Sequence, residues 1–170
     1  MDKKRYFGLW MKGNKMSVYH IVINPAGASG RTNECWNIIK KELDTIGVNY
    51  EVHLSTLEHG IKEIMQELTS TNERVNIILI GGDGSMNLAV NGIVNFDKTY
   101  LGLIPCGSGN DLAKSLGIHG TEIECLHRIL NDQNGKDLDV GILTYHTRYD
   151  EKGNKVSDEP YSRRYNISSG

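Results

Sequence analysis

Three glycines and a carboxylate stand together where a strongly apolar run ends, in the stretch 81–85, read GGDGS. Glycine has no Cβ and accepts a positive φ, so a bulky anion can lie directly against its backbone N–H groups. The carboxylate of Asp83 adds the hard oxygen ligand that Mg²⁺ prefers. These residue types at this spacing predict a site for a phosphate group and its magnesium counter-ion.

The residues on either side of this turn predict a strand and a helix. Residues 77–80 form a continuous apolar run, and the apolar residues after the turn have the spacing of a helix stripe: Met86, Ala89, Val90 and Ile93. The first turn of such a helix presents unpaired N–H donors and the positive end of its dipole. The same pattern also fits a plain connection that the glycines close for packing, with Asp83 capping its own helix.

Composition limits the function classes. The chain has 170 residues, of which 38% are hydrophobic and 24% charged, so it holds one globular domain or one domain plus a fragment. The net charge of -2 and the scattered Lys and Arg residues exclude nucleic acid as a partner. No signal peptide or apolar run of about 20 residues is present, so we expect a cytoplasmic protein whose contact with lipid, at the inner face of the membrane, is peripheral.

The three cysteines, Cys35, Cys106 and Cys125, are far apart in the sequence and form no CxxC pair. This spacing suits a reducing compartment. It predicts neither a disulfide framework nor a zinc site.

Strand and helix patterns alternate over residues 17–137, which we assign to one nucleotide-binding α/β domain. Strands are expected at 18–24, 50–54, 77–80 and 101–104, and helices at about 32–46, 58–71, 86–93, from 111 and near 122–130. This alternation predicts βαβ crossovers and a doubly wound, mainly parallel sheet. Turns rich in glycine or hydroxyl groups follow all four strands, at the carboxyl edge where such sheets bind ligands.

The two ends of the chain have different patterns. Residues 1–16 are basic and aromatic, which fits either contact with an anionic membrane surface or a leader ahead of a start at Met16. Residues 139–146 and 161–168 predict strands joined by a turn at 151–154, so we expect residues 138–170 to begin a second, antiparallel β domain. Because a two-stranded ribbon is marginal alone, the chain is expected to be a fragment or to pair with another chain, as in a homodimer.

Three blocks of sequence together resemble the diacylglycerol kinase catalytic domain family, in its bacterial lipid kinase branch. The blocks are 24–30 (NPAGASG), 81–92 (GGDGSMNLAVNG) and 105–113 (PCGSGNDLA). The resemblance covers about residues 18–170 and implies an N-terminal domain like that of NAD kinase and phosphofructokinase. It also implies transfer of phosphate from ATP, with Mg²⁺, to a lipid alcohol such as diacylglycerol at a membrane surface.

The resemblance assigns roles to residues by motif match. It implies that the turns hold the nucleotide through Asn24, Pro25, Ala26, Gly27, Ala28, Thr56, Gly81, Gly82, Asp83, Gly84, Ser85, Met86, Asn87, Ser108 and Asn110. It implies catalytic roles for Asp83 and Asp139, with Asp83 holding Mg²⁺ directly or through water. Asp111 is expected to be a capping or turn acid.

Two departures from the family pattern bear on activity. Leu88 stands where the family commonly has a glutamate, and the family's general base would lie beyond Gly170. A lipid hydroxyl needs a base during attack, so we expect this chain to be inactive alone. The GGDG turn also occurs in NAD kinases and phosphofructokinases, so a kinase with a non-lipid acceptor and a degenerate nucleotide-binding module are the alternatives.

Overall fold

The structure is a computed structural model that describes residues 17–132, 135, 137–157 and 159–166. The predicted N-terminal extension, residues 1–16, lies outside the described residues. The elements of the α/β part are, in chain order, β1 (Tyr19–Ile23), η1 (Gly27–Gly30), α2 (Arg31–Ile46), β2 (Tyr50–Leu54), α3 (Ile61–Thr69), β3 (Val75–Gly81), α4 (Asp83–Gly92), η2 (Phe96–Lys98), β4 (Thr99–Pro105), α5 (Asp111–Ser115) and α6 (Glu122–Asn131).

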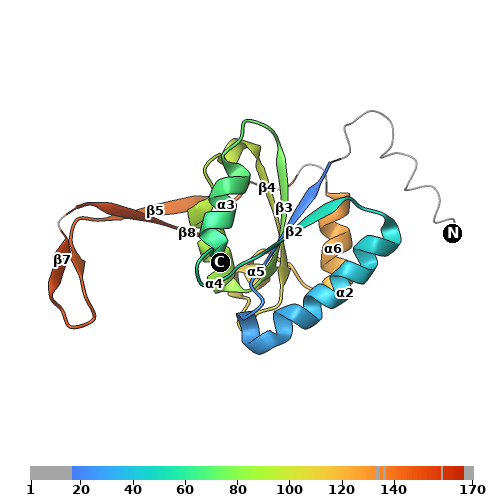
Figure 1. Ribbon diagram of the computed structural model, residues 1–170, viewed down its shortest axis with the longest axis horizontal. Helices are drawn as coiled ribbons and strands as arrows, with labels where there is room; N and C mark the ends of the chain where they lie inside the picture. Colours follow the sequence, from blue (N-terminus) through green and yellow to red (C-terminus); the bar gives the residue numbers. More distant parts are fainter. Residues whose placement is uncertain (1–16, 133–134, 136, 158, 167–170) are drawn as a thin grey trace.

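The first four strands form a parallel sheet, as predicted, and their order in the sheet is β2-β1-β3-β4. Helices α2 and α6 cover one face, and α3 and α4 cover the other (Figure 1). The side chains of β3 alternate between these layers, since Ile78 and Ile80 pack on the α2 side while Ile77 and Leu79 pack on the α3 side. All four are almost fully buried, which explains the continuous apolar run in the sequence.

Helix α3 begins at Ile61, three residues later than the sequence pattern predicts. Thr56 and His59 close a turn first, because the Thr56 N–H donates to the His59 carbonyl at 2.8 Å and the His59 N–H donates to the Thr56 hydroxyl at 3.0 Å. Glu63 then accepts the Gly60 N–H at the helix start. Within the described residues, no helix has both the length and the apolar character that crossing a bilayer requires.

The remaining strands are antiparallel, as predicted. β5 (Val140–Tyr145) pairs with β8 (Tyr161–Asn166), and the short strands β6 (Arg148–Tyr149) and β7 (Lys155–Ser157) pair beyond them. Asp150 closes the predicted turn by donating its N–H to the Asn154 carbonyl at 2.8 Å. The resulting ribbon extends away from the parallel sheet (Figure 1).

Cys35 and Cys106 form a disulfide, which the sequence analysis did not expect when it argued against a disulfide framework. The two residues are 71 positions apart, and their Cα atoms lie 6.8 Å apart. Both side chains are buried in the layer between the sheet and α2, where the segment after β4 meets the first turns of that helix. Sequence spacing does not reveal this contact. Cys125 is a buried free thiol, and burial raises its pKa.

Candidate functional site

The turns after the parallel strands lie at one edge of the sheet, because all four strands run in the same direction. Backbone hydrogen bonds join neighbouring turns in pairs. The N–H of Ser55 donates to the carbonyl of Ile23 at 2.9 Å, which links the ends of β2 and β1. The N–H of Cys106 donates to the carbonyl of Gly81 at 2.9 Å, which links the ends of β4 and β3. The structure therefore brings the predicted turns together along a single rim.

The backbones of Gly82 and Gly107 approach each other closely where the turns after β3 and β4 meet. A Cβ built on Gly82 would lie 2.9 Å from the Gly107 Cα, and one built on Gly107 would lie 2.8 Å from the Gly82 Cα. Neither backbone can move away as a flexible side chain would. Glycine is therefore required at both positions for the turns to meet. This packing requirement accounts for the two glycines in addition to their predicted role in binding phosphate.

Asp83 caps α5, a helix from the neighbouring turn, and does not cap its own helix. Its Oδ2 atom accepts the N–H of Asp111 at 3.0 Å and its Oδ1 atom accepts the N–H of Leu112 at 3.1 Å. The side chain is half-buried, so it is not sealed from solvent. A carboxylate has about four lone-pair positions. Asp83 thus retains acceptor capacity for a cation or its waters.

The start of α4 has no side-chain cap, although the helix is ten residues long. Gly82 occupies the N-cap position with extended backbone and cannot supply a side-chain acceptor. Gly84 is exposed, and a Cβ added to it would meet nothing within 4 Å. The first N–H groups of α4 are consequently open to an anion beside Asp83.

Asn110 organises the turn after β4. It adopts a positive φ of 55°. Its side-chain Oδ1 accepts the Gly107 N–H at 2.9 Å, and its Nδ2 donates to the Gly107 carbonyl at 2.7 Å. The amide is thereby engaged on both sides, whereas Ser108 is exposed at the tip of the same turn. Of the two residues in this turn that were predicted to bind the nucleotide, Ser108 is the one whose side chain is free to bind a ligand.

Asn24 shapes the turn after β1. Its Oδ1 atom accepts the Ala26 N–H at 3.1 Å, and its carbonyl accepts the Gly27 N–H at 3.0 Å. The buried hydroxyl of Thr32 donates to the Gly27 carbonyl at 3.1 Å, and this contact fixes the turn to α2. The other predicted residues here are Pro25, which lies inside the turn, and Ala28, whose backbone lies in η1.

Three other residues that were predicted to bind the nucleotide have polar groups that already form hydrogen bonds. The hydroxyl of Thr56 accepts the His59 N–H, although the residue is exposed. Met86 is 5% exposed in the core, and its N–H donates to the Gly82 carbonyl at 3.0 Å. The carbonyl of Asn87 accepts from the Asn91 amide at 2.8 Å. Met86 is therefore a core residue in the part of the chain that the structure describes.

Ser85 and Leu88 lie on the accessible side of α4. Ser85 is half-buried and packs over Gly81, since a Cβ on Gly81 would lie 2.6 Å from the Ser85 Cβ. Leu88 is 44% exposed, so an acid at this position would face solvent rather than the core.

Asp139 lies immediately before β5 and is exposed. Among the described residues, no hydrogen bond or ion pair joins it to Asp83 or to the glycine turns. The structure therefore brings the glycine turns together around Asp83, whereas the described residues show no direct bond between these turns and Asp139.

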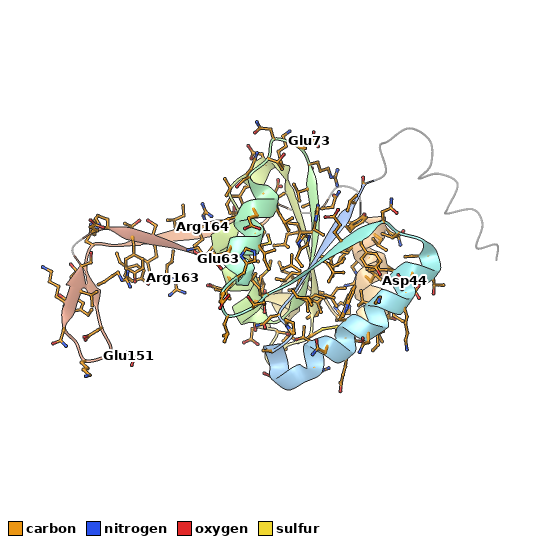
Figure 2. All side chains as sticks on the ribbon, in the orientation of Figure 1. Asp44, Glu63, Glu73, Glu151, Arg163 and Arg164 are labelled. Atoms are coloured by element: carbon orange, nitrogen blue, oxygen red, sulfur yellow. A yellow bond between two sulfur atoms is a disulfide. The ribbon has the colours of Figure 1, made fainter. Side chains whose placement is uncertain are left out.

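A pair of residues that the sequence analysis did not single out attaches the ribbon to α4. Asn91 donates its Nδ2 to the Arg164 carbonyl at 2.9 Å and accepts the Arg164 N–H at 2.8 Å. Arg164 lies where the ribbon meets the helices (Figure 2). Its guanidinium donates to the carbonyls of Val90 and Ile93, at 3.3 and 2.7 Å, and lies over the Phe96 ring. No sequence signal connects two residues that are 73 positions apart.

A hollow of about 240 Å³ opens beside Asn110, between the turn after β4 and the starts of α2 and α6. Arg31 and Lys114 line it and are both exposed, and Glu122 lies at its edge. Lys114 forms an ion pair with Asp111 at 3.3 Å. Two cationic side chains thus lie next to the rim, where they could attract a polyphosphate.

Comparisons with known proteins identify one family. The sequence profile of the diacylglycerol kinase catalytic domain matches residues 18–143. The chain is 34% identical over 130 residues to the diacylglycerol kinase of Bacillus subtilis, an alignment that covers 71% of this chain and 40% of that protein. It is 28% identical over 107 residues to human sphingosine kinase 2, covering 59% of this chain and 16% of that protein.

A solved structure has the same architecture. The crystal structure of a diacylglycerol kinase from Bacillus anthracis superposes with a TM-score of 0.61 and 25% identity, covering 78% of this chain and 45% of that one. The chain thus spans less than half the length of these relatives. The parallel sheet and its covering helices have the NAD kinase-like α/β fold. More specifically, the chain belongs to the diacylglycerol kinase catalytic domain family.

Proposed function

We propose that this chain binds ATP with Mg²⁺ at the rim of the parallel sheet and forms the nucleotide-binding part of a lipid kinase. The observation that carries the proposal is the uncapped start of α4, which lies beside the half-buried carboxylate of Asp83 where the turns after β3 and β4 meet. Free N–H groups and a carboxylate at one place suit a phosphate and its counter-cation.

Each group at the rim has a distinct role in this proposal. The backbone at Gly84 and Ser85 binds phosphate oxygens, and the exposed Ser108 hydroxyl is a further donor. Asp83 holds Mg²⁺ or its waters with the lone pairs that α5 leaves free. The ion supplies charge neutralisation for phosphoryl transfer, in which positioning and electrostatics provide most of the catalysis.

The acceptor in this proposal is a lipid hydroxyl at a membrane surface. The relatives named as a diacylglycerol kinase and a sphingosine kinase support a lipid alcohol as the chemical class. The proposal assigns no general base to the residues of this chain, and it keeps Asp139 as a second acid that would act from the start of β5. We therefore expect nucleotide binding with little or no phosphate transfer from the 170-residue chain.

Calorimetry of the 170-residue chain with ATP tests the binding step. We expect saturable binding that is stronger with Mg²⁺ than with EDTA. Absence of binding under both conditions would contradict the proposal. Transfer of radiolabelled phosphate by a protein of the relatives' length, with diacylglycerol micelles and NAD as competing acceptors, tests the acceptor class; labelling of NAD alone would exclude a lipid kinase.

The exposed Leu88 favours a second candidate, a nucleotide-binding module without transferase activity. An acid at this exposed position of α4 would face the solvent side of the rim, and leucine cannot replace its charge. If the chain is such a module, it binds ATP, but a protein of the relatives' length that contains it phosphorylates no lipid alcohol. A Leu88→Glu variant of the longer protein that gains transfer activity would favour this second candidate.

A further inference from the structure

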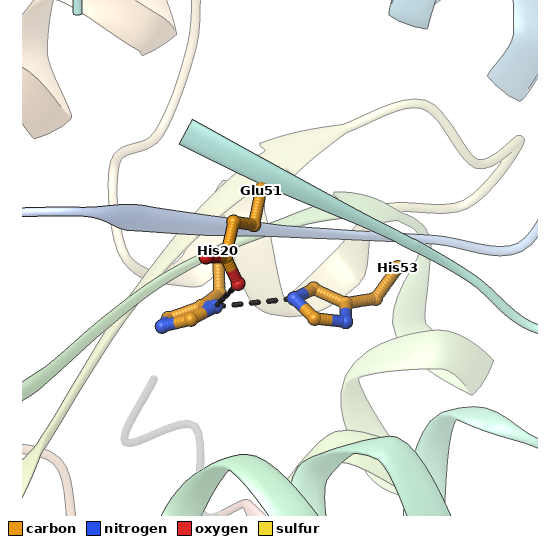
Figure 3. A group of neighbouring side chains, drawn as sticks. All are labelled: His20, Glu51 and His53. Carbon is orange, nitrogen blue, oxygen red and sulfur yellow. Dashed lines mark hydrogen bonds and ion pairs between the residues drawn. The ribbon is translucent and has the colours of Figure 1, made fainter. Parts of the chain in front are cut away.

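His20, Glu51 and His53 form a cluster away from the rim, on strands β1 and β2 (Figure 3). His20 pairs with Glu51 in the parallel register, and His53 follows Glu51 by two positions, so all three side chains extend from the same face of the sheet. This is the face that α3 covers further along the strands. The sequence analysis considered metal binding through cysteines and did not examine these residues.

The ligand atoms of the cluster converge on one point. His20 Nδ1 lies 3.1 Å from His53 Nε2 and 3.6 Å from Glu51 Oε2, and all three atoms lie within 4.8 Å of one another. A tetrahedral zinc centre has bonds of about 2.0–2.2 Å, which places its ligand atoms about 3.3–3.5 Å apart. Two of the separations are already close to that value. The Glu51 side chain is 63% exposed and can rotate to shorten the third.

The chemistry of the donors selects the kind of metal. Two imidazole nitrogens and one carboxylate oxygen suit Zn²⁺ and similar divalent transition metals, whereas Mg²⁺ prefers oxygen ligands alone. A neutral imidazole presents one lone pair to a metal ion. The carboxylate of Glu51 lies beside both rings and adds the negative charge that favours a divalent cation.

We propose that His20, Glu51 and His53 form a binding site for one divalent transition-metal ion, represented by Zn²⁺, with a fourth position open to water. The ion joins β2, the edge strand, to β1 through side chains in addition to the backbone ladder. This site is independent of the nucleotide proposal and uses none of its residues, so either proposal can fail alone.

Titration of the 170-residue chain with Zn²⁺ against a chromophoric chelator tests the site. We expect the wild type to bind one equivalent of Zn²⁺ tightly. Both His20→Gln and His53→Gln should lower the affinity for Zn²⁺ by at least about tenfold, because replacing a residue that only contacts a metal ligand already lowers metal affinity by about 10–100-fold. Co²⁺ as a second probe should give the visible bands of a four-coordinate centre. It should give no thiolate charge-transfer band, since no cysteine belongs to the cluster.

His127→Gln is the matched control, because His127 also contacts a carboxylate, that of Glu42 at 2.6 Å, but lies on α6. This variant should retain the tight equivalent. Circular dichroism of each metal-free variant checks that the fold is intact. If a cluster variant unfolds, Glu51→Gln provides the same test at an exposed position. A wild type without a tight equivalent, affinity unchanged by the cluster variants, equal loss in His127→Gln, or a thiolate band would each overturn the proposal.

Discussion

Asp83 Oδ1 accepts the backbone N–H of Leu112 at 3.1 Å and thereby ties the turn after β3 to the helix after β4. The Asp111 N–H donates to the other oxygen of the same carboxylate at 3.0 Å. One side chain therefore holds two turns of the rim in place. In the proposed function it also faces the counter-cation, so its structural and ligand roles have to be separated by experiment.

Replacing Asp83 with alanine removes both roles at once. We expect Asp83→Ala to lower the free energy of unfolding by about 0.5–2 kcal/mol, the usual cost of losing a helix cap. Asp83→Asn keeps the shape and one oxygen acceptor but removes the charge. We expect Asp83→Asn to weaken ATP binding in the presence of Mg²⁺ by about tenfold or more, as for the loss of an interaction with a charged group. ATP binding in the presence of EDTA should change little.

Urea unfolding and calorimetry check these two effects separately. If Asp83→Asn weakens ATP binding equally with Mg²⁺ and with EDTA, Asp83 positions the turns and does not hold the ion. Asp111→Asn is the matched control, because the Asp111 side chain is exposed and pairs with Lys114 rather than with the turns.

The glycines of the rim differ in how much space an added Cβ would have. We expect Gly107→Ala to destabilise the chain by about 1–3 kcal/mol, because its Cβ would lie 2.8 Å from the Gly82 Cα and overpacking costs that much. Gly84→Ala meets nothing within 4 Å, so we expect its stability to change by less than about 0.5 kcal/mol. Any loss of ATP affinity in Gly84→Ala then reports a phosphate close to that residue. Unchanged affinity would mean that the phosphate lies elsewhere.

Local sequence patterns predicted most of this fold. The continuous apolar run of β3 reflects burial on both faces of the sheet, and the stripe of Met86, Ala89 and Val90 reflects burial of one helix face, so each left a local signal in the sequence. The parallel direction of the first four strands followed from the βαβ pattern. The glycine and carboxylate residues of the rim were identifiable because their residue types are unusual at the end of a strand.

Contacts between distant residues could not be predicted from the sequence. The Cys35–Cys106 disulfide depends on how α2 packs against the end of β4, which no local pattern encodes. Asp83 was considered as a cap for its own helix, yet it caps α5, because the turns approach through Gly82 and Gly107. The His20 cluster likewise depends on strand register rather than on sequence spacing.

The start of α6 provides a test of pH dependence. Glu124 accepts the Thr121 N–H at 2.7 Å and interacts with the Thr121 hydroxyl at 3.2 Å. Both hydrogen bonds lower the pKa of Glu124, and the one from the backbone N–H has the larger effect. Because the folded-state pKa lies below the unfolded one, this stabilisation is present above the unfolded pKa and is lost as the pH falls through the folded pKa.

Thr121→Ala removes the hydroxyl but keeps the backbone N–H donor, so it should raise the pKa of Glu124 part of the way toward its ordinary value. Relative to wild type, the variant should lose most stability near neutral pH, and the part of this loss that depends on the charge of Glu124 should disappear in acid. Carboxyl NMR titration and urea unfolding at several pH values check both statements. A stability difference that stays constant from neutral to acidic pH would show that the charged form of Glu124 contributes nothing.

Arg164 connects the antiparallel ribbon to α4, the helix that begins at Asp83. Its backbone pairs with the Asn91 amide, and its guanidinium donates to the Val90 and Ile93 carbonyls, so Arg164→Ala removes the bonds made by the side chain. We expect amide hydrogen exchange in β8 to accelerate by about tenfold, as for the loss of roughly 1.4 kcal/mol of local stability. The neighbouring Arg163 is exposed, so Arg163→Ala should leave exchange unchanged (Figure 2). Equal acceleration in both variants would mean that the ribbon is held by its strand pairing and not by α4.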